Sequence, residues 1–401
     1  MKQVVSTERL FVYGALCIAA IAVLVIFYTS SDTRADTQTA AVAPIEDSIK
    51  ESAAISPEIA ALSSSSESPS HLQTPTTVHG IYLTGWSAGI PRVIDRTIDM
   101  ATKGAINSVV IDIKDATGKL SYAPLDPSIV PSGAVTHRIK DVQGLIRKLH
   151  EHNIYVIGRL VVFEDPYFAL AHPEAAFTNT KTGQTWKNYK GIAWLRPDST
   201  EVWEYVSAIA KDASLQGFDE INLDYVRFPS DGDLVAIDRP KTSELRISIM
   251  TDFFSFLDQS LRKESGIVLS ADIFGLTLSA KDDLGIGQKL EAIAPYVDYL
   301  SPMIYPSHFA PKTYGIDDPS RHPYEMIHRS LQDGIQKLAV IGYGPDLLRP
   351  WLQDFDLLGV HYTKDEIAQQ IRGGTEQGVD SWLFWDPRNS YDSFRSFFDN
   401  Q

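Results

Sequence analysis

Two acidic side chains stand in short runs that are rich in apolar residues, and their chemistry points to one reaction. Asp224 lies in the run 219–228 and Asp272 in the run 267–275. Cleavage of a glycosidic bond needs one protonated carboxyl group to expel the leaving group and one ionised carboxylate to attack or to activate water. We therefore interpret Asp224 as the nucleophile or base and Asp272 as the acid.

Further polar and aromatic side chains stand near the ends of similar runs. Lys114 follows Asp112 by two positions, which places both on one strand face, where Lys114 could hold a carboxylate ionised or form a structural ion pair with Asp112. We predict that the following side chains bind the substrate: Trp86, Asp112, Lys114, Asp115, Arg159, Arg227, Met303, Tyr305, His308, Tyr343, Trp385 and Asp386.

The elements that must position these residues follow a regular alternation after His79. Strand-like runs occupy 80–87, 108–115, 154–164, 219–228, 267–275, 296–305, 337–343 and 379–386. Amphipathic stretches lie near 91–103, 138–152, 200–215, 243–264, 285–294, 322–334, 363–377 and 391–399. Strands that alternate with helices pair in parallel, and eight such repeats predict a single (β/α)8 TIM barrel.

Barrel enzymes carry their catalytic groups at the C-terminal ends of the strands. Alternation along the fourth run places Asn222, Asp224 and Val226 on one face, and the apolar residues between them on the other. The apolar face of the strand is expected to pack against the outer helices. Asp224, on the other face, is therefore expected to point towards the barrel axis near the C-terminal end of the strand.

Three long connections follow strands, and loops of this length in a compact domain are usually functional. Aromatic residues gather in the first of them, where their rings could bind the faces of sugar units or could pin the loop to the barrel. The connections are 165–199, 229–242 and 306–321, and the aromatic residues are Tyr167, Trp186, Tyr189 and Trp194.

Other chemistries lack their motifs. The chain has no His-Glu-x-x-His sequence, and His79, His137, His308 and His322 show no ligand spacing, so we predict neither a metal nor a cofactor. It also lacks a Gly-x-Ser-x-Gly elbow and a phosphate-binding Gly-Lys-Ser/Thr loop, which argues against a serine hydrolase and against nucleotide binding.

The N-terminal part differs in composition from the rest. Residues 10–28 are almost wholly apolar and are long enough to cross a lipid bilayer, although a cleaved signal peptide is the competing interpretation. We predict a cytoplasmic tail over 1–9, a transmembrane anchor over 10–28, a disordered linker rich in Ser, Ala, Thr and Pro over 29–77, and the barrel domain over 78–401. The barrel would then lie outside the cell membrane.

Charge and cysteine content limit the partners further. The formal net charge of -15 argues against a nucleic-acid partner, which requires a basic surface, and favours a neutral substrate. Cys17 is the single cysteine of the sequence, so no disulfide can form within the chain.

Several segments resemble the bacterial putative glycosyl hydrolase domain family. They are 109–115, 159–163, 219–229, 298–308 and 349–354, and the resemblance spans about 79–390. It implies a barrel of the glycoside hydrolase type. A more distant similarity to the family-18 chitinase-like hydrolases rests on Phe218, Asp219, Asp224, Met303, Tyr305 and Trp385.

The chain departs from that second family at two positions. The glutamate that serves as its general acid would fall on Val226, and one inner aspartate falls on Asn222. Chitinase chemistry that relies on this glutamate is therefore not expected, and Asp272 is the candidate that replaces it.

These observations lead to a hypothesis with two alternatives. The chain is expected to be a membrane-anchored glycoside hydrolase that acts on a cell-surface or extracellular polysaccharide. The first alternative is a catalytically inactive glycan-binding barrel of the cell envelope, and the second is a structural anchor for an envelope complex.

Overall fold

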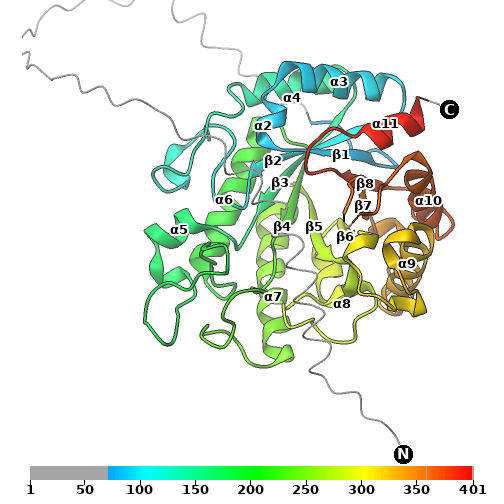
Figure 1. The fold of residues 1–401 in the computed structure, drawn as a ribbon. Coiled ribbons are helices and arrows are strands. Elements are labelled where there is room, and N and C mark those ends of the chain that lie inside the picture. Colours follow the sequence, from blue (N-terminus) through cyan, green and yellow to red (C-terminus); the bar gives the residue numbers. More distant parts are fainter. Residues whose placement is uncertain (1–70, 358, 400–401) are drawn as a thin grey trace, which may run out of the picture. The chain divides into compact units, whose positions relative to one another are not determined.

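The computed structural model describes residues 71–357 and 359–399, and eight parallel strands form a closed barrel at its centre (Figure 1). Each strand pairs with the next in chain order, and the first pairs with the last. The strands are β1 His79–Leu83, β2 Ser108–Lys114, β3 Tyr155–Val161, β4 Glu220–Asp224, β5 Val268–Phe274, β6 Tyr299–Met303, β7 Trp351–Gln353 and β8 Trp382–Trp385. The predicted TIM barrel is confirmed.

Helices surround the strands (Figure 1), and most of the predicted amphipathic stretches are found among them. Local sequence explains several of their ends: the Asp141 side chain caps α4, Thr363 and Glu366 form a capping box at α10, and α6 ends at Gly217 in a left-handed conformation. The helices are α2 Gly85–Ala88, α3 Pro91–Thr102, α4 Val142–His150, α5 Pro166–Ala171, α6 Thr200–Gln216, α7 Ser243–Leu257, α8 Leu290–Ile293, α9 Pro323–Val340, α10 Lys364–Thr375 and α11 Asp392–Phe398.

The predicted seventh strand was wrong. Residues 337–340 form the last turn of α9, and 341–343 belong to the connection that follows it, whereas β7 begins only at Trp351. The apolar run 338–341 has strand-like composition, but it continues an amphipathic helix whose packing decides its conformation. The real strand is only three residues long, which is too short to show a periodic pattern.

The strands separate two apolar regions. Residues that point outward, such as Val109, Leu160 and Leu223, pack with the helices in a continuous core. Residues that point inward include Tyr82, Tyr155 and Trp351, which form a separate cluster within the barrel. The inward face therefore holds the polar residues that the outer core excludes.

Residues 72–78 close the N-terminal end of the barrel. The backbone N–H of Leu72 donates to Asp219, directly before β4, over 2.7 Å, and the Thr74 hydroxyl lies 3.0 Å from the hydroxyl of Tyr155 at the start of β3. The predicted linker boundary at residue 77 is thus corrected, because these residues belong to the barrel domain.

The remaining N-terminal predictions fall outside the described residues. The tail over 1–9, the span over 10–28 and the linker up to residue 70 all precede His71. Within 71–357 and 359–399, none of the helices combines the length and the apolar composition that a membrane crossing requires.

Candidate active site

Arg159 joins two buried aspartates at the C-terminal ends of three adjacent strands. From β3 it donates through Nη1 to Asp112 Oδ1 on β2 over 2.7 Å, and through Nε to Asp224 Oδ2 on β4 over 3.0 Å, with Nη2 also on Asp224. The side chains of Arg159, Asp112 and Asp224 are 6%, 3% and 10% exposed. Burial raises the pKa of Asp112, although the positive charge of Arg159 lowers it in part.

Asp272 on β5 has neutral partners instead. Its Oδ1 accepts hydrogen bonds from the Trp351 indole N–H over 2.7 Å and from the Asn222 side-chain amide over 3.0 Å. Burial raises the pKa of Asp272 well above its usual value, and the charge of Asp224 raises it further. Among the described residues, only Oδ1 of this carboxyl group receives hydrogen bonds, so Oδ2 can hold a proton.

The two aspartates therefore have different environments on adjacent strands. Asp224 is paired with a cation, and its Oδ1 also accepts the backbone N–H of Tyr225 over 2.6 Å. Asp272 is buried among neutral donors, which favours its protonated form. One carboxyl group beside a cation and a second one among neutral donors form the arrangement that acid and base catalysis requires.

Aromatic rings line the barrel interior beside Arg159. Tyr82 and Trp385 stack with ring centres 3.9 Å apart, and Trp351 meets the Trp385 ring edge to face at 5.6 Å. The Arg159 guanidinium carbon lies 5.3 Å from the centre of the Trp385 ring, and the Tyr82 hydroxyl donates to Asp112 over 2.7 Å. Trp385 is half-buried and offers an aromatic surface near the two acids.

Met303, Tyr305 and His308 lie on β6 and directly after it. Met303 is half-buried against the inner cluster, and burial and the negative charges of Asp272 and Asp224 raise the pKa of Tyr305 well above its usual value. His308 is also half-buried, and burial lowers its pKa to about 4. The structure thus brings Tyr305 near both acids.

Lys114 does not share a strand face with Asp112. The pairing register of β2 and β3 shifts between Asp112 and Lys114, and this bulge turns the lysine away from the barrel axis. Lys114 forms a buried ion pair with Asp165, 4.9 Å from the centre of the Tyr205 ring on α6. Its predicted place beside the site was therefore wrong.

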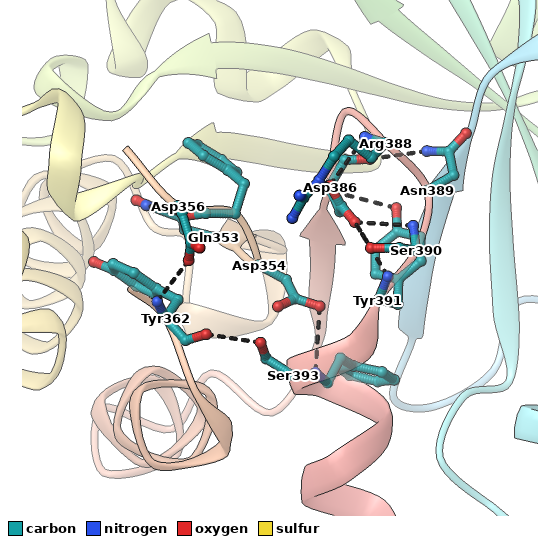
Figure 2. A network of polar contacts seen from close by, with 12 residues as sticks. Gln353, Asp354, Asp356, Tyr362, Asp386, Arg388, Asn389, Ser390, Tyr391 and Ser393 are labelled. Carbon is teal, nitrogen blue, oxygen red and sulfur yellow. Dashed lines mark hydrogen bonds and ion pairs between the residues drawn. The ribbon is translucent and has the colours of Figure 1, made fainter. Parts of the chain in front are cut away.

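Tyr343 and Asp386 also differ from the prediction. Tyr343 lies between α9 and β7, at the opposite end of the barrel from the strand termini that carry the acids. Asp386 directly follows β8 and is 1% exposed. Its oxygens accept backbone N–H groups of Arg388, Ser390 and Tyr391 at 2.9 to 3.1 Å (Figure 2). Asp386 therefore holds the loop that leads to α11.

Asp115 and Arg227 support loops at the mouth. Asp115 forms an ion pair with Arg138, whose guanidinium group lies over the ring of the exposed Trp86. The Arg227 guanidinium donates to the Phe228 carbonyl over 3.1 Å and lies over the rings of Trp194, Tyr225 and Phe274.

Val226 does not lie on the same face as Asp224. Tyr225 has a φ of 51°, so the chain turns out of the strand directly after Asp224. Val226 is fully buried in the core that faces the helices. The expected alternation stops at Asp224, and Val226 is not the position from which an acid could enter the barrel mouth.

The predicted site omitted Tyr82, Trp351 and Glu164. Oε1 of Glu164 accepts a hydrogen bond from Asn188 over 3.0 Å, whereas Oε2 is buried with no hydrogen-bond partner among the described residues. Burial raises the pKa of Glu164 to about 7. Its place at the end of the predicted strand run 154–164 was a signal for Glu164, whereas Trp351 could be found only with the correct position of β7.

The sequence left open whether the aromatic residues of the loop 165–199 bind sugar rings or fix the loop to the barrel. Trp186 and Trp194 are each 1% exposed and fix the loop to the barrel, whereas Tyr189 is 82% exposed. The rings that are fully buried have no free face for a ligand.

Other potential sites in the described chain lie elsewhere. His172, Glu174 and Glu201 place one possible ligand atom each within 4.8 Å of one another, on the outer side of the loop after β3 and on α6. Two surface hollows, of about 310 and 520 Å³, lie near the starts of β5 and β6 and beside the connection 229–242. Neither hollow is lined by Asp224 or Asp272.

Comparison with known proteins identifies the family of the chain. The family described as "Putative glycosyl hydrolase domain" matches residues 80–391, which is most of the chain. The chain belongs to this family. The match includes all eight strand ends and confirms the resemblance inferred from the segments above.

Solved structures include similar barrels. A hypothetical protein from Ruminiclostridium thermocellum is 34% identical, over 48% of this chain and 96% of that chain, with a TM-score of 0.42. The glycoside hydrolase domain of PgaB (BpsB) from Bordetella bronchiseptica is 15% identical, over 80% of this chain and 98% of that chain, with a TM-score of 0.57. This second likeness shows the fold alone. No curated protein matches the chain.

Proposed function

We propose that this member of the family hydrolyses glycosidic bonds of a cell-surface or extracellular polysaccharide. Asp272 donates a proton to the leaving oxygen, and Asp224 attacks the sugar or activates water. The observation that carries the proposal is the contrast between the two carboxyl groups: Asp224 is paired with Arg159, whereas Asp272 is buried among neutral donors.

The neighbouring residues have supporting roles in this proposal. Arg159 places its positive charge beside Asp224, and Trp351 and Asn222 orient the Asp272 carboxyl group so that its second oxygen carries the proton. Trp385 presents an aromatic face on which the apolar side of a sugar ring can stack.

One observation favours the alternative of a glycan-binding barrel. Both oxygens of Asp224 already accept hydrogen bonds, two from Arg159 on Oδ2 and one from Tyr225 on Oδ1. A nucleophile needs a free lone pair, and each engaged oxygen has fewer of them to offer. Under this alternative the barrel binds a glycan and releases no product.

Single substitutions of the two acids test the enzyme proposal. Asp224→Asn and Asp272→Asn each keep the shape of the side chain and remove its ability to ionise, so we expect hydrolysis to fall by about 100-fold or more. The measurement is release of reducing sugar from a panel of bacterial polysaccharides, with thermal unfolding as the check on folding.

The outcomes separate the two functions. Full activity in both single variants would contradict the assignment of the acids. Glycan binding by the unsubstituted chain without any released sugar would contradict the hydrolase proposal and support a glycan-binding barrel.

We also propose that residues 10–28 anchor the chain in the cell membrane, with the barrel outside. The apolar composition of this segment supports the proposal. Protease added to intact cells should then remove the barrel domain while a cytoplasmic marker survives, and deletion of 10–28 should release the domain from the membrane fraction. Protection of the barrel in intact cells would contradict this orientation.

A further inference from the structure

Trp86 is a large apolar side chain that remains open to solvent. It lies on α2, directly after β1, and is 66% exposed. Burying an indole ring in the barrel wall would remove a large apolar area from water, which is favourable by about 25 cal/mol per Å². The exposed ring of Trp86, directly after a barrel strand, would therefore gain free energy from a ligand that covers it.

Arg138 and Asp115 hold the ring in place. The guanidinium carbon of Arg138 lies 5.0 Å from the centre of a Trp86 ring, and the same guanidinium forms an ion pair with Asp115. The side chains of Arg138 and Asp115 are only 8% and 21% exposed, and the backbone N–H of Thr117 donates to Asp115 over 2.9 Å. One face of the indole is thus backed by a fixed cation, while the rest of the side chain is accessible.

The position of Trp86 is distant from the two acids. In the closed order of strands, β1 lies opposite β5, which carries Asp272. Eight strands spaced about 4.8 Å apart enclose a barrel roughly 15 Å across, so a ligand that reaches both residues must cross the mouth. The stacked pair of Tyr82 and Trp385, on β1 and β8, lies on the same side of the barrel as Trp86.

We propose that Trp86 forms a distal subsite that stacks on a sugar unit of a long oligosaccharide whose cleaved bond lies at Asp224 and Asp272. Asp115 and Arg138 are positioning residues for the ring. The inference rests on the proposed function and adds a substrate class to it. A chain that crosses the mouth reaches both positions, whereas a disaccharide reaches only one, so the enzyme selects polymers over short oligosaccharides.

Oligomer series of glucose, galactose and N-acetylglucosamine, from disaccharide to octamer, test this selection with the full chain. Trp86→Ala should raise KM for the longest cleaved oligomers about tenfold and leave their kcat nearly unchanged, since stacking is lost far from the reacting bond. The effect should shrink as the oligomer shortens. Trp86→Phe should recover most of the loss, and Arg138→Gln should give an intermediate KM.

Leu215→Ala is the matched control, because Leu215 is 60% exposed on α6, which precedes β4 on the outside of the barrel. It should leave KM unchanged at every length. Equal effects of Trp86→Ala on short and long oligomers, or no effect on long ones, would overturn the distal subsite while Asp224→Asn still abolishes activity. If the unsubstituted chain cleaves none of these series nor the polysaccharide panel, the proposed function fails together with the subsite.

Discussion

At the scale of single residues, Arg159 provides the positive charge that faces two of the acids of the candidate site. It is the shared partner of Asp112 and Asp224, and all three side chains are largely buried. Removing one member of a buried ion pair leaves an uncompensated charge, which costs much more than the loss of an exposed pair.

Arg159→Met should therefore lower the free energy of unfolding by about 3–5 kcal/mol. Urea unfolding measures this change. Arg196→Met is a suitable comparison, because the pair of Arg196 and Asp198 has side chains 27% and 34% exposed and should contribute at most about 1 kcal/mol. Losses of similar size in the two variants would show that the buried network is weaker than its geometry indicates.

Residue types at strand ends predicted much of the candidate site. Asp112, Arg159, Asp224 and Asp272 all lie inside the barrel, on four adjacent strands, near whose predicted ends they stand in the sequence. Asp386 has the same sequence context, yet backbone N–H groups of the next residues take up its oxygens. Sequence cannot separate these cases, because the partners of a carboxylate depend on how the following loop folds.

At the scale of elements, two departures from regular structure account for the main errors. A bulge in β2 turns Lys114 away from the axis, and a left-handed Tyr225 ends the alternation after Asp224. The bulge shifts Lys114 by one position, and the left-handed residue ends β4, so Val226 no longer follows the alternation of the strand. Neither has a local sequence signal, since no glycine stands at either point.

The ends of β7 and β8 contain a second pair of acids, Asp354 and Asp386 (Figure 2). Asp354 is 4% exposed, and its Oδ2 accepts the backbone N–H of Phe394 on α11 over 3.3 Å. Burial, together with the charges of Asp386 and Asp392, raises the pKa of Asp354 to about 7, although hydrogen bonds from Phe394 and Ser393 lower it.

This pKa predicts a pH-dependent stability. An unfolded aspartate has a pKa of about 3.9, so between about pH 4 and pH 7 the folded state binds a proton that the unfolded state lacks. Stability contributed by this group is therefore present below pH 4 and is lost as the pH rises through 7. Asn does not ionise, so the free energy of unfolding of Asp354→Asn should not fall in this way as the pH rises from about 4 to about 7. Relative to the unsubstituted chain, the variant should gain up to roughly 4 kcal/mol across that pH range.

Urea unfolding of both proteins at about pH 4.5 and about pH 8 measures the difference. The comparison isolates Asp354, because Glu164 and Asp272 contribute equally in both chains. Parallel stability curves for the two proteins would contradict a raised pKa at this position.

At the scale of the whole molecule, the N-terminal strap over 72–78 determines where the folded domain begins. Val78 is 1% exposed, and Leu72 and Thr74 bond to residues at the starts of β4 and β3. The composition of 71–77 resembles the preceding linker, so sequence alone placed the boundary too late. The contacts that order this segment come from residues far along the chain.

A chain that begins at residue 79 should be less stable than one that begins at residue 71, by about 3–6 kcal/mol. It loses the buried side chain of Val78, the half-buried side chain of Leu72 and five hydrogen bonds that Leu72, Thr74, Thr77 and Val78 make to the barrel. Urea unfolding of the two shortened proteins measures this difference. Equal stability would mean that the strap only covers the barrel end without stabilising it.

The same strap contacts the end of the barrel that lies opposite the candidate site. Leu72, Thr74 and Val78 contact the first residues of strands, whereas Asp224 and Asp272 stand at or near the last ones. His71, where the described part of the chain begins, therefore lies at the end of the barrel opposite the acids. A shortened protein that begins at His71 and is immobilised through that residue, on a bead or on a sensor surface, would present its acids to the solution, where an insoluble substrate could reach them.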